Sequence, residues 1–268
     1  MTTAPLSKKP RKLSLQKMIP NMITLTALAT GMTSVKFAIA AKWELAVFAI
    51  VAAAFMDAFD GAAARLLKAQ SALGAELDSF SDFVCFGVAP AIVTYLWTLE
   101  SAGRWGWPVA LIFAIAVALR LSRFNIASED GDKDNPLNKY FSGIPSPAGG
   151  GLCLLPLIVS FQIDPAITDK FIRPQAVAIW VLIVAAMMVS HIPTFSSKQL
   201  RIPVKMKVLA LAIFAIIVAG LINDPWPTLT LLGIAYLLML PFGVMHYNRK
   251  ARALAAGKRD HDDSDLED

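Results

Sequence analysis

The chain has 268 residues, of which 56% are hydrophobic and only 17% are charged, and its mean hydropathy is +0.56. An ordinary soluble domain carries roughly 25% charged residues, so this composition excludes that class and indicates an integral membrane protein. The formal net charge is +5. The positive residues follow the loop pattern described below, so no nucleic-acid partner is needed to explain them.

The apolar residues form eight runs of about twenty residues, the length that crosses ~30 Å of hydrocarbon as a helix rising ~1.5 Å per residue. We therefore predict an all-α fold, a polytopic membrane bundle of about eight transmembrane helices. In chain order, the predicted spans are residues 20–41, 44–65, 76–99, 106–127, 146–163, 174–193, 205–223 and 227–246.

These runs divide the chain into four segments. We expect a basic leader at residues 1–19, a membrane core at 20–193, an additional pair of transmembrane helices at 194–247 and a charged tail at 248–268. The first apolar run is too long for a cleaved signal peptide. The leader is expected either to lie on the membrane surface as a short interfacial helix or to be a disordered tail.

The basic residues predict the orientation in the membrane. If the N-terminus is cytoplasmic, eighteen of the 25 Lys and Arg residues fall in cytoplasmic segments, four fall in external loops and three fall within spans. Because positively charged loops stay in the cytoplasm, we predict that both termini are cytoplasmic.

Four aspartates interrupt the apolar pattern within residues 56–83, MDAFDGAAARLLKAQSALGAELDSFSDF. Asp57 and Asp60 lie at the end of the second predicted span, and Asp78 and Asp82 lie at the start of the third. Side chains three or four residues apart share one face of a helix. In the predicted topology, all four carboxylates therefore meet at the cytoplasmic surface.

Carboxylates gathered in one site repel one another, and the single arginine of this stretch, Arg65, cannot neutralise four of them. The sequence therefore predicts a bound cation. The histidines are scattered, and Cys85 and Cys153 lie in separate apolar runs, which argues against zinc. Oxygen ligands suit Mg²⁺ or Mn²⁺, and a cluster of this size can hold two ions about 3.5–4 Å apart.

Two other interpretations of the aspartates stay open. They can cap helices or face water at the membrane surface, or they can line the pathway of a cation transporter. A transporter is expected to place its charges near the middle of the membrane, whereas these four gather at one face.

The aspartates belong to a longer pattern with fixed gaps. The pattern reads Asp57-x2-Asp60-Gly61-x2-Ala64-Arg65-x8-Gly74-x3-Asp78-x3-Asp82. It resembles the signature of the CDP-alcohol phosphotransferases at every fixed position. The resemblance implies a membrane enzyme, usually a homodimer, that transfers a phosphatidyl group from a CDP-activated lipid to an alcohol and releases CMP.

The same resemblance implies roles for individual residues. The aspartates of the pattern would ligate two divalent metal ions, and Asp82 would also act as the general base. The residues implied in binding the CDP-lipid are Gly61, Arg65, Ser71, Asn21 and Thr24. For the last three, ordinary positions in a loop or at the start of a helix are the alternative.

Two later stretches, RLSRFNIAS from Arg120 and YFSGIPSPAGG from Tyr140, are similar to paired motifs of phosphatidylserine synthases. This likeness implies CDP-diacylglycerol and L-serine as substrates. A serine site must bind a carboxylate, for which guanidinium groups are suited. The candidate serine-binding residues are Arg120, Arg123, Asn125, Ser142 and Ser146. The alternatives are arginines that reach lipid headgroups, and glycerol 3-phosphate or an inositol compound as the acceptor.

Overall fold

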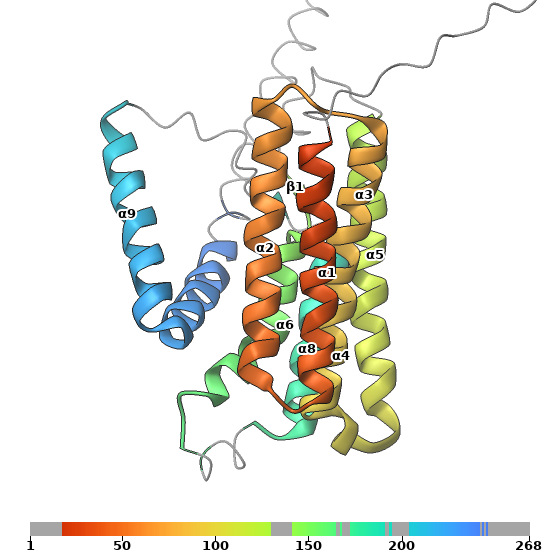
Figure 1. Ribbon diagram of the computed structural model, residues 1–268. Helices are drawn as coiled ribbons and strands as arrows, with labels where there is room; N and C mark the ends of the chain where they lie inside the picture. The colour runs from red at the N-terminus through yellow and green to blue at the C-terminus, as the bar shows by residue number, and fades with distance from the viewer. Residues whose placement is uncertain are drawn as a thin grey trace, which may run out of the picture.

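The computed structural model describes residues 18–129, 141–164, 167, 172–190, 193–194, 204–241, 243 and 245. Within these ranges the secondary structure is helical apart from one pair of two-residue strands (Figure 1). Residues 1–17 of the predicted leader and the whole of the predicted tail lie outside the described residues. The all-α class predicted from the apolar runs is confirmed.

The helices that the structure describes follow one another along the chain. In chain order they are α1 (Ile19–Ile39), α2 (Trp43–Leu66), α3 (Ala72–Asp82), a π-helical turn (Phe83–Val88), α4 (Ala89–Trp97), a 3₁₀ segment (Leu99–Trp105), α5 (Gly106–Glu129), α6 (Ser146–Ser160), α8 (Pro174–Val189), α9 (Val204–Asn223) and a last apolar helix (Pro225–Pro241).

Among the described residues, four helical stretches are long and apolar enough to cross a membrane. They are Ile19–Ile39, Trp43–Leu66, Ala72–Trp97 and Leu99–Ile126. The other four predicted spans coincide with shorter apolar helices, at Ser146–Ser160, Pro174–Val189, Leu211–Asn223 and Pro225–Pro241. The structure thus supports four spans by helix length, and about eight remains a prediction.

The outer surface of the bundle is apolar. On α5, Leu111, Ile115 and Leu119 lie four residues apart, and each side chain is about half exposed, at 48%, 48% and 50%. A contiguous apolar stripe is unfavourable in water but is the normal surface of a helix that faces lipid. Together with the four long apolar helices, this surface identifies an integral membrane protein.

The interior consists of tightly packed helices. α1 contacts α2, α3 and α4, and α5 contacts α8 (Figure 1). One buried cluster lies between α5, α6 and α8 and includes Phe113, Leu152 and Val181. A second lies between α2, α4 and α6 and includes Val47 and Leu157. These clusters fix α2, α4, α5, α6 and α8 against one another.

A short strand pair joins the two connections on either side of α6 and α8. β1 (Phe141–Ser142) pairs antiparallel with β2 (Pro193–Thr194). Gly143 follows β1 with a φ of +83°, and a Cβ atom there would collide with the carbonyl oxygen of Met188. Only glycine fits both the backbone conformation and the space. This contact holds the start of α6 against the end of α8.

The last helix, Pro225–Pro241, joins the predicted additional pair to the bundle, while α9 lies outside it (Figure 1). The Trp226 ring packs on Phe48 of α2 and on Phe161, with ring centroids 4.7 and 4.6 Å away. Gln162 Nε2 donates a hydrogen bond of 2.7 Å to Thr230 Oγ1. The last helix is therefore part of the packed bundle.

Candidate active site

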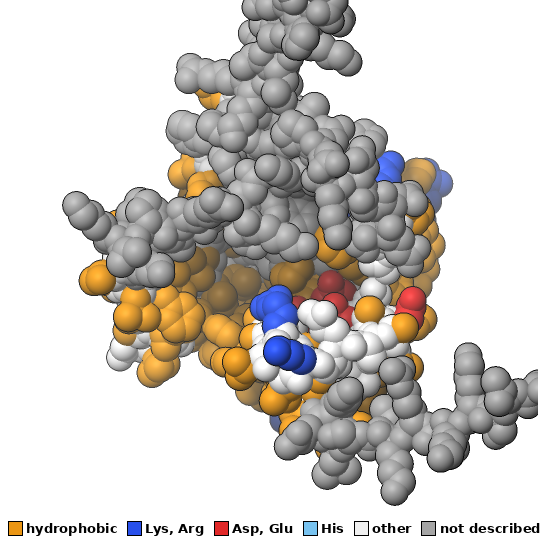
Figure 2. Space-filling view, turned by 90° about the horizontal axis from the view of Figure 1, so that it is seen from above, with side chains coloured by type: hydrophobic (Ala, Val, Ile, Leu, Met, Phe, Trp, Pro, Cys, Tyr) orange, Lys and Arg blue, Asp and Glu red, His pale blue; other side chains and the backbone are white. Residues whose placement is uncertain are grey.

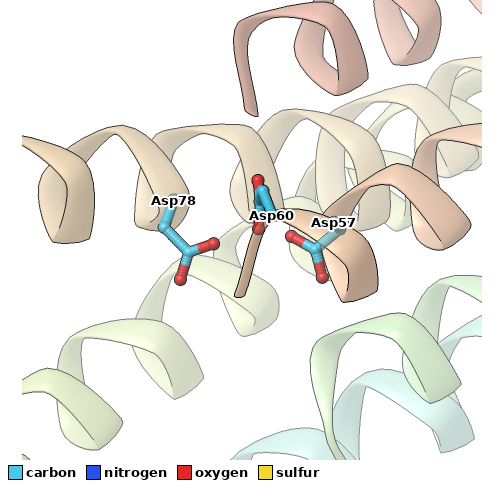
Figure 3. Close-up of side chains that lie close together, drawn as sticks. All are labelled: Asp57, Asp60 and Asp78. Atoms are coloured by element: carbon cyan, nitrogen blue, oxygen red, sulfur yellow. The ribbon is translucent and has the colours of Figure 1, made fainter. Parts of the chain in front are cut away.

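Three aspartates form a compact group where α2 and α3 face each other. Asp57 and Asp60 lie one turn apart on α2, and Asp78 lies on α3 (Figure 3). One carboxylate oxygen from each of the three lies within 4.8 Å of the others. Asp60 is buried, Asp57 is half-buried and Asp78 is exposed. The group is thus open to solution on the α3 side.

Asp82 is the last residue of α3 and lies one turn after Asp78. It is outside the compact group of three, but its carboxyl group lies within hydrogen-bonding reach of Asp57. One carboxylate oxygen each of Asp57, Asp60 and Asp82 is buried without a hydrogen-bond partner among the described residues. The four aspartates therefore lie close together as predicted. Asp82 lies next to Asp57, outside the compact group of three.

These unpaired oxygens show whether the site is suited to a cation. Burying a carboxylate without a partner is strongly unfavourable, and several such groups close together add mutual repulsion. The donor set consists of oxygen atoms from short carboxylates, which is the set preferred by Mg²⁺ and Mn²⁺. The residues present therefore fit one or more hard divalent cations.

A π-helical turn directly after Asp82 sets how α3 continues into α4. The turn buries Cys85, Phe86 and Gly87. A Cβ atom on Gly87 would lie 3.1 Å from Val117 of α5, and one on Gly150 of α6 would lie 3.0 Å from the carbonyl oxygen of Phe86. The wider turn changes the helix register, so that Asp78 and Asp82 face α2 while the next residues pack against α5 and α6.

The backbone of α2 is open beside the carboxylates. A Cβ atom on Gly61 would have no atom within 4 Å, so a ligand can approach the main chain next to Asp60. One turn later, Arg65 is exposed. From above, acidic side chains lie in and beside a hollow of this face, with basic side chains next to it (Figure 2). This arrangement suits an anionic ligand that binds together with a metal cation.

The three weaker lipid-binding candidates lie at the edge of the group. The Thr24 hydroxyl donates to the Pro20 carbonyl oxygen at 3.0 Å and lies next to Asp60. Asn21 Oδ1 would lie 2.9 Å from a Cβ atom on Gly74, so Gly74 allows α1 and α3 to approach closely. Ser71 Oγ accepts a bond of 3.0 Å from the Gly74 backbone N–H, which is the ordinary helix cap.

Arg120 and Ser146 form a buried contact within electrostatic range of Asp82. The Arg120 side chain is buried, with 8% exposed, and its Nη1 donates a bond of 2.7 Å to the buried Ser146 Oγ. Its positive charge lies close enough to interact with Asp82. A buried guanidinium is suited to bind an anionic group of a small substrate.

The other predicted serine-binding residues have contacts that stabilise the fold. Arg123 is exposed and donates to the Val189 carbonyl oxygen at the end of α8. Asn125 Nδ2 donates a bond of 3.0 Å to Ser79 Oγ and so connects α5 with α3. Ser142 lies in β1, but its side chain is outside the described part of the structure.

Comparison with known proteins identifies the family. Residues 17–254 match the family model of CDP-alcohol phosphatidyltransferase. The chain belongs to this family. It is 35% identical over 230 residues to the CDP-diacylglycerol–serine O-phosphatidyltransferase of Mycobacterium tuberculosis, covering 85% of this chain and 78% of the relative. The corresponding Helicobacter pylori protein is 31% identical over 202 residues, which are 75% of this chain and 81% of that protein.

Three features of this phosphatidyltransferase-family chain were not predicted from the sequence. The π turn after Asp82 has no simple sequence signal. Gly143 stands in the quoted SGIPSP motif, and a glycine between a strand and a proline could have been read as a turn with positive φ. Tyr236 of the last helix has a buried hydroxyl near Arg120, and its only signal is a phenol in an apolar run.

Proposed function

We propose that this protein transfers the phosphatidyl group of CDP-diacylglycerol to the hydroxyl group of L-serine, giving phosphatidylserine and CMP. Membership of the CDP-alcohol phosphatidyltransferase family supports the reaction type. The two relatives are CDP-diacylglycerol–serine O-phosphatidyltransferases, which supports serine as acceptor. The observation that carries the proposal is the buried Arg120 within electrostatic range of Asp82, because a guanidinium suits the carboxylate of serine and a carboxylate suits the proton of its hydroxyl.

In this proposal, Asp82 accepts the proton of the serine hydroxyl. The serine oxygen forms a bond to the phosphorus that carries the diacylglycerol, and the bond from that phosphorus to the CMP oxygen breaks. Asp82 is suited to this step because one of its oxygens is buried without a partner among the described residues and is therefore free to accept a hydrogen bond from the acceptor.

The CDP end of the lipid is assigned to the open side of the carboxylate group. Asp57, Asp60, Asp78 and Asp82 would hold two Mg²⁺ or Mn²⁺ ions, which supply charge neutralisation for the diphosphate and the departing CMP. Gly61 leaves space for the nucleotide beside α2, and the exposed Arg65 offers a planar guanidinium to phosphate oxygens. Asn21 and Thr24 lie at the edge of this side.

The acceptor is assigned to the opposite side of Asp82. Arg120 binds the carboxylate of serine, and Ser146 orients the guanidinium. Arg123 and Asn125 support the pocket through their contacts with α8 and α3. We assign them a positioning role.

The test is an acceptor panel. Purified protein is supplied with CDP-diacylglycerol and Mn²⁺ or Mg²⁺, and CMP release is measured with L-serine, glycerol 3-phosphate or inositol. L-serine is expected to give the fastest release, with phosphatidylserine as the lipid product. Equal or faster release with glycerol 3-phosphate or inositol would overturn the acceptor assignment but not the family. Transport of cations without CMP release would overturn the enzyme assignment.

We also propose that about eight helices cross the membrane, with both termini and the carboxylates on the cytoplasmic side. Lys68 follows α2 and Arg104 precedes α5, and the 26-residue helix Ala72–Trp97 separates them, which is about 39 Å at ~1.5 Å per residue. Single cysteines at these positions, in a background without Cys85 and Cys153, are treated with an impermeant thiol reagent on intact cells. Labelling is expected at position 104 and not at 68; the reverse would invert the orientation.

The homodimer implied by the family resemblance remains part of the proposal. Its test is the mass of the protein in detergent, corrected for bound detergent. A monomer that is fully active in the acceptor assay would rule out a requirement for the dimer.

A further inference from the structure

The last helix, Pro225–Pro241, presents one continuous face to the bundle. The side chains of Trp226, Leu229, Tyr236, Leu237 and Leu240 pack against the two buried clusters. A Cβ atom on Gly233 would lie 3.0 Å from Leu155 of α6, so the helix lies close to α6 one turn before Tyr236. Residues of this helix before and after Tyr236 pack against the bundle, and these contacts hold Tyr236 in place.

The Tyr236 hydroxyl is the unusual member of this face. Its oxygen is buried, yet it has no hydrogen-bond partner among the described residues. Buried hydroxyl groups nearly always have a partner, and leaving one unpaired is unfavourable. A phenylalanine would fill the same apolar space without that penalty. The hydroxyl is therefore available to a ligand that reaches this position.

The neighbour of the hydroxyl indicates what that ligand is. Tyr236 and Arg120 lie within electrostatic range of each other, and Arg120 also contacts Ser146 and lies within electrostatic range of Asp82. The Arg120 guanidinium of α5 is thus bonded to a serine hydroxyl of α6, and the phenol of the last helix and the proposed general base both lie within its electrostatic range. A phenol donates one hydrogen bond and Arg120 only donates, so the shared partner is an acceptor of hydrogen bonds with negative charge.

We propose that the Tyr236 hydroxyl donates a hydrogen bond to the carboxylate of the acceptor amino acid that Arg120 binds. This inference rests on the proposed function and adds a residue from the last helix to the acceptor site. An ammonium group is the poorer partner at this position because Arg120 would repel it. Tyr236 is thus a specificity residue for the carboxylate.

The test is Tyr236→Phe, assayed as purified full-length protein with CDP-diacylglycerol and L-serine. Loss of a hydrogen bond to a charged group is expected to raise the KM for L-serine about 10-fold or more. The KM for CDP-diacylglycerol should change less than about 3-fold, because the donor binds on the other side of Asp82. A merely structural role would alter both KM values or the amount of folded protein instead.

Tyr95→Phe is the matched control. Tyr95 of α4 packs against the same buried cluster, and its ring contacts Trp107 edge-on with centroids 5.3 Å apart. It lies thirteen residues after Asp82, about 20 Å along a helix at ~1.5 Å per residue. Removing its hydroxyl should leave both KM values unchanged.

The double variant Arg120→Lys with Tyr236→Phe tests whether both residues bind the same group. If they share one carboxylate, the combined rise in the KM for L-serine is smaller than the product of the two single effects. Full additivity would overturn the carboxylate assignment. An unchanged KM for L-serine in Tyr236→Phe would overturn this inference alone. A wild-type protein that releases no CMP with L-serine would overturn the proposed function, and this inference with it.

Discussion

The two polar regions of the bundle differ in how their charges are satisfied. In the carboxylate region, where α2 meets α3, Asp57, Asp60 and Asp82 each keep a buried oxygen without a partner among the described residues. In the arginine region, formed by α5, α6 and α8, Arg120 is bonded to Ser146 and Arg123 to the end of α8. Both arginines of the second region thus have a hydrogen-bond partner within the protein, whereas three carboxylates of the first region keep unpaired oxygens.

This difference indicates how each region works. Carboxylates that are buried without partners are stabilised by the positive charge of a bound cation. An arginine already held by a serine hydroxyl has little freedom to lose when it binds an anion. We therefore interpret the carboxylate region as a site completed by ligands and the arginine region as a preformed site for the acceptor. The experiments below test this contrast, beginning with the largest expected effect.

Removal of divalent cations should abolish the activity of the carboxylate region completely. In EDTA, CMP release from CDP-diacylglycerol and L-serine should fall to background, and added Mg²⁺ or Mn²⁺ should restore it, because three of the aspartates keep a buried oxygen without a hydrogen-bond partner among the described residues. Full turnover in EDTA would show that the carboxylates work without a cation and would remove the contrast between the two regions.

Asp82→Asn should lower kcat by ~10²–10⁴-fold, because the amide keeps the size of the side chain but cannot accept the proton of the acceptor. The KM for CDP-diacylglycerol should change much less. Glu76→Gln is the control, since Glu76 is exposed on the same helix and lies outside the aspartate group. Near-normal turnover of Asp82→Asn, measured as CMP release, would mean that Asp82 is not the base.

The arginine region should respond through the KM for L-serine. Arg120→Lys keeps the charge but loses the planar guanidinium, so we expect this KM to rise about 10-fold. In Arg123→Lys it should rise less than about 3-fold, because a lysine can also donate to the Val189 carbonyl oxygen. Steady-state kinetics at saturating CDP-diacylglycerol measure both. Equal effects of the two variants would mean that the two arginines share the acceptor site.

The smallest expected effect concerns the contact between Gly143 and the end of α8, which positions α6 in the arginine region. Gly143→Ala should lower the stability by about 1–3 kcal/mol, because alanine disfavours the positive φ and its Cβ atom would collide with the Met188 carbonyl oxygen. Gly151→Ala on α6 is the control: a Cβ atom there has open space, and alanine favours the helix. Thermal unfolding in detergent gives the two Tm values. A Tm of Gly143→Ala equal to that of the control would contradict the packing argument.

Much of the fold and part of the candidate site could be predicted from the sequence. Each predicted span coincides with an apolar helix, because about twenty consecutive apolar residues have few structures open to them in lipid. The aspartates on α2 and α3 were predicted together because a spacing of three or four residues fixes a helix face. Their assignment as ligands, and that of Asp82 as base, remain predictions.

The same reasoning could not predict which of Arg120 and Arg123 is buried in the candidate site. Both occur in one short motif three residues apart, and both were candidates for binding serine, with at least one expected to do so. The structure buries Arg120 against Ser146 and leaves Arg123 exposed at the end of α8. Which arginine faces the site depends on where α6 and α8 pack against α5, and no spacing within the motif contains that information.

The sequence by itself determined the helical membrane class, the positions of the apolar helices and the face on which the aspartates gather, because these follow from local periodicity and hydropathy. Only the tertiary structure decided three other points: the register change at the π turn after Asp82, the requirement for glycine at position 143, and the position of the Tyr236 hydroxyl near Arg120. Each depends on contacts between helices far apart in the chain, where close packing selects one arrangement among many that the local sequence allows.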